Sequence, residues 1–319
     1  MCGYPRGVSS STRSLTVQAQ DTGRRLDLFL AEQLALSRAQ VRRLLASGAV
    51  ELDGRRVGEA EKGARLLSPA SVAVAPFARR EEQRAVAEPD AELVVRAQGP
   101  GWLAVDKPAG RPVHPLREDE TGTVLNALIA REPQVHGVGE GGLRSGVVHR
   151  LDVDTSGVLL LATEAQSWDR LRRAFAEHRV EKVYRALVLG RVPQAGSAEL
   201  PLVTARHRPA RVRVAAADEL ARGARIGSLT YRPLEVFESV TLLEVRPRTG
   251  FLHQIRATLA HLGFPVAGDR SYGPASDPTG AARQMLHAAR VAFEEIEAES
   301  PDAADFAALC TGLRSGRPE

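Results

Sequence analysis

The chain has 319 residues, 43% hydrophobic and 26% charged, a balance that is ordinary for a globular protein of about two domains. Its two cysteines stand far apart, at positions 2 and 310, which excludes a disulfide framework or a zinc cluster built on cysteine. No apolar run approaches the roughly 18 residues of a membrane span, so we expect a cytoplasmic protein that does not bind membranes. The net charge is only +4, but 40 of the 43 basic residues are arginines, whose planar guanidinium suits phosphate. Codon bias in a high-GC genome would give the same excess of arginine.

The first predicted unit spans residues 21–75 and follows a polar tail over residues 1–20. The segment RRLDLFLAEQL places apolar side chains at helical spacing. The next segment, LSRAQVRRLLASG, predicts a second helix that Ser37 caps and Gly48 ends. Asp53-Gly54 then predicts a tight hairpin turn inside a small sheet. These signals indicate a small domain of two helices and a sheet.

A charged segment at residues 76–92 predicts a linker, and a larger domain follows over residues 93–300. Its strand-like runs mostly follow one another without a helix between them, which indicates a mixed, mainly antiparallel sheet. We expect helices at 121–131, 166–178 and 252–262, and a C-terminal tail over 301–319. The predicted fold class is therefore α+β.

Basic side chains gather on the second predicted helix of the first domain. Arg38 and Arg42 stand one turn apart, on the face opposite the apolar stripe. Seen alone, a solvated charged face is the simpler interpretation. However, residues 24–58 closely resemble the alpha-L RNA-binding domain of a small-subunit ribosomal protein and several RNA-modifying enzymes. The resemblance implies that Arg24, Arg38, Arg42 and Arg43 contact RNA.

The segment HRLDVDTSG at 149–157 places charged residues directly before the apolar run VLLLA. A strand end beside a turn is a rigid support for a reactive group, although a turn with incidental charges is the simpler interpretation. Asp152 and Asp154 would point to opposite sides of an extended chain, so we expect one of them to work alone. A metal site at Asp-x-Asp is the other possibility, but no further acidic cluster supports it.

HRLDVDTSG resembles the signature of the RluA-type pseudouridine synthases, which isomerise uridine in RNA. The resemblance implies that Asp152 is the catalytic residue and that Arg150 inserts where the flipped-out nucleotide had been. We expect His149, in the same segment, to contact RNA. In WLAVDKPAGRPVHP, which is similar to the family's first motif, we expect Lys107 to do the same.

Two later segments carry the same resemblance, which covers residues 93–295. EKVYRALVLG implies that Tyr184 packs against the target base, although a tyrosine in such a strand is more often a core residue. The segment 246–273 implies that a buried Arg256 pairs with Asp152. For His253 alone we expect a structural histidine rather than a general base. Phe251 and Leu252 depart from the family pattern, so a phosphate or RNA contact is expected to be missing there.

The resemblance implies an RNA pseudouridine synthase, with large-subunit ribosomal RNA as the expected partner and substrate. The reaction involves no redox step and no activated water, so we expect no cofactor and no metal. We also expect a monomer. Two alternatives remain: a non-catalytic RNA-binding or ribosome-assembly factor on the same fold, and a metal-dependent hydrolase that uses Asp152 and Asp154.

Overall fold

The computed structural model describes residues 11–207, 209–216, 219–220 and 223–316. The chain divides into two compact units, Met1–Gln83 and Arg84–Glu319, and each is described by itself. The α+β class predicted from the sequence is confirmed.

The N-terminal unit packs two helices on a four-stranded sheet of order β1-β4-β2-β3. Its elements are β1 (Arg13–Val17), α1 (Leu26–Gln33), α2 (Arg38–Ala46), β2 (Val50–Leu52), β3 (Arg55–Arg56) and β4 (Ala70–Val74). The Ser37 hydroxyl accepts a hydrogen bond from the backbone N–H of Gln40 and caps α2, as predicted. Asp53 and Gly54 both have positive φ angles, 49° and 75°, so the predicted tight turn joins β2 to β3.

The boundaries of this unit differ from the prediction at both ends. Residues 13–17 were expected in a tail but form β1, which pairs with β4, and Val17 is buried. The rest of the predicted tail, residues 1–10, lies outside the described residues. The predicted linker is also shorter than expected, because Phe77 packs on the core of this unit. Ala85 is buried in the core of the other unit, where the Asn126 side chain donates a hydrogen bond to the Val86 carbonyl.

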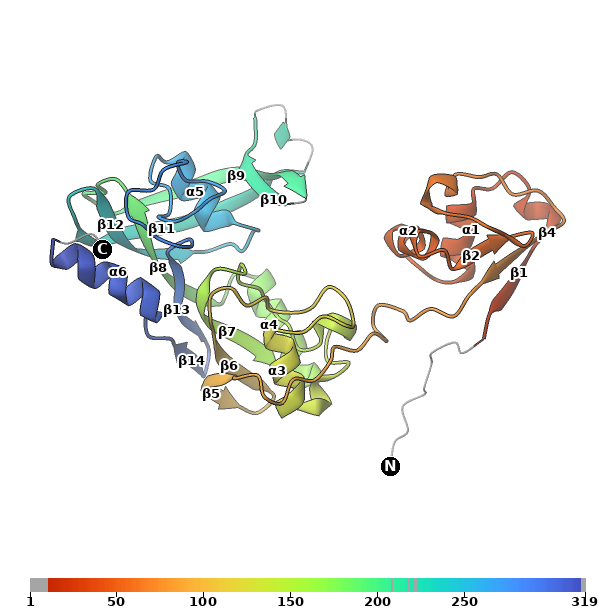
Figure 1. Ribbon diagram of the computed structural model, residues 1–319, viewed down its shortest axis with the longest axis horizontal. Helices are drawn as coiled ribbons and strands as arrows, with labels where there is room; N and C mark the ends of the chain where they lie inside the picture. The colour runs from red at the N-terminus through yellow and green to blue at the C-terminus, as the bar shows by residue number, and fades with distance from the viewer. Residues whose placement is uncertain (1–10, 208, 217–218, 221–222, 317–319) are drawn as a thin grey trace. The chain divides into compact units, whose positions relative to one another are not determined.

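The C-terminal unit is built on one large sheet whose strands run in the order β10-β9-β11-β12-β8-β13-β7-β6-β5, with β14 paired to β13 (Figure 1). Every pairing among these strands is antiparallel except that of β13 with β7. The strands are β5 (Val94–Gly99), β6 (Trp102–Lys107), β7 (Ser156–Ala162), β8 (Glu181–Leu189), β9 (Gly196–His207), β10 (Ala210–Val214), β11 (Arg225–Val236), β12 (Val240–Pro247), β13 (Leu286–Phe293) and β14 (Ile296–Glu299).

Helices cover both faces of this sheet. On one face, α3 (Val124–Arg131) packs on β6 and β7, and α5 (Gln254–His261) packs on β8 and β12. Tyr184 belongs to both apolar clusters, so it lies where they meet. On the other face, α4 (Ala165–Ala176) packs on β6 and β7, and α6 (Ala304–Arg314) packs on β8 and β12. The helices predicted near 121–131, 166–178 and 252–262 are thus α3, α4 and α5.

The segment predicted as a C-terminal tail, 301–319, is largely helical instead. Residues 304–314 form α6, in which Phe306 and Cys310 are buried against Leu187 and Leu242 of the sheet. Two buried side chains a single turn apart give too weak a periodic signal to predict a helix from sequence. Their burial makes α6 part of the core of the unit.

Candidate active site

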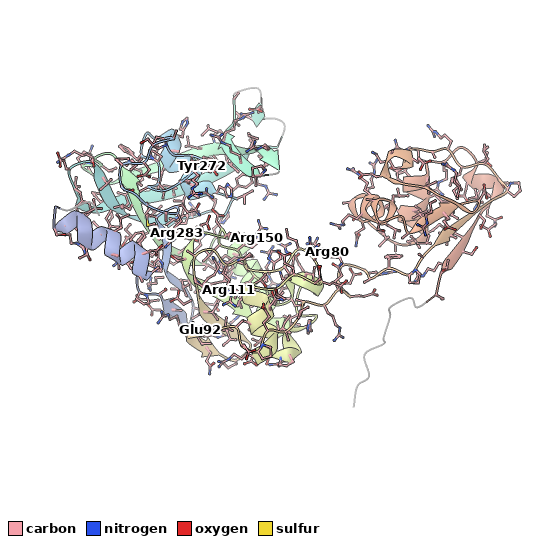
Figure 2. The ribbon with its side chains drawn as sticks, in the orientation of Figure 1. Arg80, Glu92, Arg111, Arg150, Tyr272 and Arg283 are labelled. Carbon is pink, nitrogen blue, oxygen red and sulfur yellow. The ribbon has the colours of Figure 1, made fainter. Side chains whose placement is uncertain are left out.

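Asp152 lies in the turn that leads into β7, and its position is set by backbone and side-chain contacts. The Thr155 backbone N–H donates to the Asp152 carbonyl at 3.1 Å and closes the turn. Gln284, just before β13, donates from its side chain to the Thr155 hydroxyl at 2.9 Å. The neighbouring Arg283, which Figure 2 labels, donates to the Asp154 carbonyl at 2.9 Å. Arg283 is itself held by the carboxylate of Asp305 in α6. The turn is therefore braced from the C-terminal part of the chain.

Arg256 of α5 pairs with Asp152, as the sequence predicted. Its Nη1 donates to Asp152 Oδ2 at 2.8 Å, while Nε and Nη2 donate to the two carboxylate oxygens of Asp269 at 2.6 and 2.8 Å. The Asp269 side chain is fully buried, whereas that of Asp152 is 21% exposed. Burial opposes the charge of Arg256, but Asp269 and then Asp152 raise the pKa of its guanidinium above the ordinary value. A buried and permanently charged arginine thus faces an accessible carboxylate.

Tyr184 of β8 is placed beside this pair by β13. Ala288 pairs with Gly157 of β7 on one side and with Tyr184 of β8 on the other. Gly157 has a φ of 112°, and a Cβ there would lie 2.2 Å from the Ala288 carbonyl oxygen, so only glycine allows this approach. Burial first, and then the negative charge of Asp152, raise the pKa of the Tyr184 hydroxyl. Asp152, Tyr184 and Arg256, predicted from three separate segments, therefore meet in one site.

The two other charged residues of the turn, Arg150 and Asp154, are exposed. Arg150, which Figure 2 labels, forms no ion pair with any residue in the part of the chain that the structure describes. The backbone carbonyl of Asp154 accepts a hydrogen bond from Arg283, and its side chain is exposed. That one of the two acids works alone stays a prediction, and the pairing with Arg256 singles out Asp152.

His149 was expected to contact RNA, and the structure corrects this. Its Nε2 accepts a hydrogen bond from the backbone N–H of Leu160 at 2.9 Å, and its ring stacks on Phe175 with centroids 4.5 Å apart. Burial lowers the pKa of the imidazole to about 3, and the positive charges of Lys182 and Arg172 add to this effect. His149 is thus a neutral residue that holds the turn to β7.

Lys107 was also expected to contact RNA, but its side chain is completely buried. Its Nζ donates to the carbonyl oxygens of Pro108, Arg111 and Val153, at 2.9, 2.8 and 2.7 Å. Burial lowers the pKa of this ammonium to about 7, against the raising effect of the two acids in the turn. Lys107 therefore joins the loop after β6 to the turn of Asp152 and does not reach a ligand.

The arginines predicted to bind RNA in the N-terminal unit separate into two groups. Arg24 is half-buried and its guanidinium pairs with Asp21 at 2.9 Å and Glu32 at 2.5 Å, so its charge is used within the unit. Arg38, Arg42 and Arg43 of α2 are exposed and form no ion pair with any residue that the structure describes. Only these three are available for phosphate.

Phe251 and Leu252, the departures from the family pattern, lie just before α5. Both pack against an apolar cluster that contains Leu202 of β9 and Val212 of β10. The two side chains therefore connect α5 to the β9–β10 hairpin.

The structure adds three residues that the sequence analysis missed: Asp269, Arg283 and Asp305. Asp269 stands within the segment 246–273, where an acid near the arginine could have been noticed. Arg283 and Asp305 act on the turn of Asp152 from more than 100 positions away, and nothing in their local sequence indicates this. Across the described ranges, no group of three or more histidines, cysteines and acids is placed to hold a metal ion. Likewise, none of the described helices has the length and apolar character needed to cross a membrane.

Known protein families match parts of both units of the chain. The RNA pseudouridylate synthase family matches residues 101–261, and the S4 domain family matches residues 24–62. An uncharacterized RNA pseudouridine synthase of Chloroflexus aurantiacus is 39% identical over 283 residues, which cover 88% of this chain and 85% of that protein. The ribosomal large subunit pseudouridine synthase D of Xanthomonas campestris pv. campestris is 35% identical and covers 96% of this chain and 94% of its own length.

A solved structure shares the fold. Human RNA pseudouridylate synthase domain containing 1 matches with a TM-score of 0.55 and 24% identity, over 73% of this chain and 99% of that one. The family match spans the β6–α5 region that contains Asp152, Tyr184 and Arg256, and the S4 match spans both helices of the N-terminal unit. The chain therefore belongs to the RNA pseudouridine synthases, isomerases that act on RNA, and carries an S4 domain before its catalytic unit.

Proposed function

We propose that this enzyme isomerises specific uridines of large-subunit ribosomal RNA, with Asp152 as the essential catalytic residue acting on a flipped-out nucleotide. The relatives from Xanthomonas campestris pv. campestris and Pseudomonas aeruginosa are both named ribosomal large subunit pseudouridine synthase D, and they match 96% of this chain. The observation that carries the proposal is the single hydrogen bond by which a buried Arg256 holds the accessible Asp152.

The chemistry requires that the Asp152 carboxylate be ionised, whether it attacks the sugar or takes a proton from the ribose. An aspartate has a reference pKa of about 3.9 and is charged at neutral pH in water. In the site, Arg256 donates a hydrogen bond to one oxygen of this carboxylate. Because Arg256 uses only one nitrogen on Asp152, the second carboxylate oxygen remains available for the reacting nucleotide.

Access to the bond between uracil and ribose requires that the nucleotide leave its helix, at a cost of a few kcal/mol in lost stacking. The exposed Arg150 stands two residues before Asp152 in the same turn. Its unpaired guanidinium can fill the gap left in the RNA and bond phosphates there, which offsets the cost of flipping. The braced turn would thus present the catalyst and the inserted side chain together.

Tyr184 supplies an aromatic surface on the wall of the site. It packs between the apolar clusters under α3 and α5, so its ring is held in place for stacking on the uracil. Since its hydroxyl pKa is raised, the phenol stays protonated at neutral pH. A protonated phenol cannot readily accept the C5 proton. Tyr184 is therefore better suited to holding the uracil than to removing that proton.

The proposal is tested by mapping pseudouridines in ribosomal RNA from cells that lack the gene. A large-subunit position that loses the modification, and regains it with the wild-type gene but not with Asp152→Asn, supports the assignment. The alternative of a non-catalytic ribosome-assembly factor predicts that the modification pattern stays unchanged. Loss of a modification from another class of RNA alone would disprove the ribosomal substrate while leaving the reaction intact.

A further inference from the structure

His253 lies at the start of α5 beside the catalytic pair. Its Nε2 is 3.9 Å from Asp152 Oδ1, and its Nδ1 is 3.0 Å from the hydroxyl of Tyr272. The backbone of His253 is left-handed, with φ 51° and ψ 20°, an uncommon conformation for a residue other than glycine. Such a conformation persists only where the surroundings fix it, and it often marks a functional position.

The electrostatics of the site select one form of the ring. Burial lowers the pKa of His253, although the charge of Asp152 opposes this, so the neutral ring is favoured at neutral pH. A neutral imidazole carries one proton, and the nitrogen that faces the Asp152 carboxylate is the favoured place for it. Nε2 is then the donor, and Nδ1 accepts from Tyr272.

The surroundings of Tyr272 support this direction. Its hydroxyl oxygen accepts a hydrogen bond from the backbone N–H of Val212 in β10 at 2.7 Å, so its own hydrogen is free to be donated to His253. The Arg256 guanidinium lies over its ring, 5.1 Å from the centroid (Figure 2 labels Tyr272). Tyr272 is therefore fixed by both β10 and the arginine that holds Asp152.

We propose that His253 donates a hydrogen bond from Nε2 to the nucleotide held at Asp152, and that Tyr272 is a positioning residue that fixes the orientation and tautomer of His253. At 3.9 Å from the carboxylate, the N–H is too far for a direct hydrogen bond to Asp152. No other acceptor for Nε2 is found among the residues that the structure describes. A ribose hydroxyl or a uracil carbonyl beside Asp152 would supply that acceptor. The inference rests on the proposed role of Asp152.

The test compares single-turnover rates of tritium release from C5-labelled uridine RNA. Tyr272→Phe keeps the ring and removes only the hydroxyl. Tyr231→Phe is the matched control, because the Tyr231 hydroxyl makes no hydrogen bond to any residue in the described part of the chain. At saturating RNA, Tyr272→Phe is expected to react about five- to tenfold more slowly than Tyr231→Phe, the effect of one lost hydrogen bond. RNA affinity should change less than twofold, because phosphate contacts elsewhere supply most of it.

The double variant distinguishes positioning from a general structural role. His253→Asn keeps a residue that tolerates left-handed backbone, but its shorter side chain places no donor at the position of Nε2. If Tyr272 acts through His253, Tyr272→Phe in the His253→Asn background should cause no further loss of rate. Additive losses, or a Tyr272→Phe rate equal to that of the Tyr231→Phe control, would overturn the inference.

Two further measurements complete the design. Nitrogen-15 spectra of the histidine rings should show His253 protonated at Nε2 and bare at Nδ1, with its signals identified by their loss in His253→Asn. A proton on Nδ1 would contradict the proposal. Asp152→Asn in the same rate assay distinguishes a failure of the proposed function from a failure of the inference about His253 and Tyr272. If the Asp152→Asn enzyme is active, the proposed function itself is wrong. If Asp152→Asn is inactive but Tyr272→Phe reacts as fast as the control, only the inference is wrong.

Discussion

Arg256 bonds Asp152 through one terminal nitrogen and commits the rest of its guanidinium to the buried Asp269. The two acids therefore have different tasks, although both pair with the same arginine. Asp269 satisfies the buried charge and fixes its direction, while Asp152 keeps an exposed oxygen. A symmetrical pair between Arg256 and Asp152 alone would have occupied both carboxylate oxygens and left neither for the reacting nucleotide.

Asp152→Asn should abolish isomerisation with little change in RNA affinity, because the shape is kept and only the charge is lost. Asp154→Asn is the matched control and should retain most activity, since its side chain is exposed and only its backbone is used. Tritium release from C5-labelled uridine RNA measures both. A metal hydrolase would lose function at both positions and a binding protein at neither, so either pattern would contradict the assignment.

Asp269→Asn should lower the free energy of unfolding by about 3 kcal/mol, because breaking a buried ion pair leaves a poorly compensated charge. Activity should fall as well, because Arg256 is no longer held in one direction. Urea denaturation gives the stability and tritium release the activity. Asp119→Asn, at an exposed pair with Arg117, should leave both unchanged. Full activity of Asp269→Asn would show that the pairing of Arg256 with Asp269 does not position Asp152.

Gly157→Ala should destabilise the catalytic unit and reduce activity, because a Cβ would force β7 away from Ala288. Gly263→Ala is the matched control, since Gly263 also has a positive φ, 87°, but open space around the missing Cβ. The control should lose about 1–2 kcal/mol from backbone strain alone. Thermal unfolding of both variants makes the comparison, and equal losses would mean that the contact with β13 contributes nothing.

Between about pH 3 and 6.5 the unfolded chain should bind one more proton at His149 than the folded chain does, because burial lowers the folded pKa to about 3. Stability is therefore expected to fall as the pH falls through this window. Gln at position 149 can still accept a hydrogen bond from the Leu160 N–H, but it does not titrate. In His149→Gln, the slope of the free energy of unfolding against pH should therefore flatten by about 1.4 kcal/mol per pH unit. Urea unfolding between pH 4 and 6 measures it. A slope that stays the same in His149→Gln would refute the buried neutral state.

Replacing Arg38, Arg42 and Arg43 together by Gln should weaken RNA binding and flatten its salt dependence. Each lost phosphate contact removes about 0.7–0.9 from the slope of log affinity against log salt, so the triple change should remove about 2–3. Arg24→Gln is the control, because Arg24 is paired with Asp21 and Glu32. If Arg24→Gln flattens the salt dependence of RNA binding and the triple change in α2 does not, then Arg24 rather than the exposed α2 arginines contacts phosphate.

The sequence predicted the candidate catalytic residues better than the residues that hold them in place. Asp152, Tyr184 and Arg256 stand in segments whose resemblance to a known family is specific, and the structure brings them together. His149 and Lys107 stand in equally specific segments but hold backbone groups, and a charged or polar residue type alone does not show this. Arg283 and Asp305 could not be predicted, because their contacts depend on packing between distant parts of the chain.

The place of β13 in the sheet has a consequence for how the enzyme is made. β13 lies between β7 and β8, although it is among the last strands in the sequence. On the ribosome, β5–β7 and β8–β12 therefore emerge as two separate half-sheets, and no strand joins them until residues 286–293 arrive. A polypeptide that stops before that point has both Asp152 and Tyr184 but lacks the strand that pairs with β7 on one side and β8 on the other. Partial translation products of this enzyme should thus be unable to modify RNA, however well their separate halves fold.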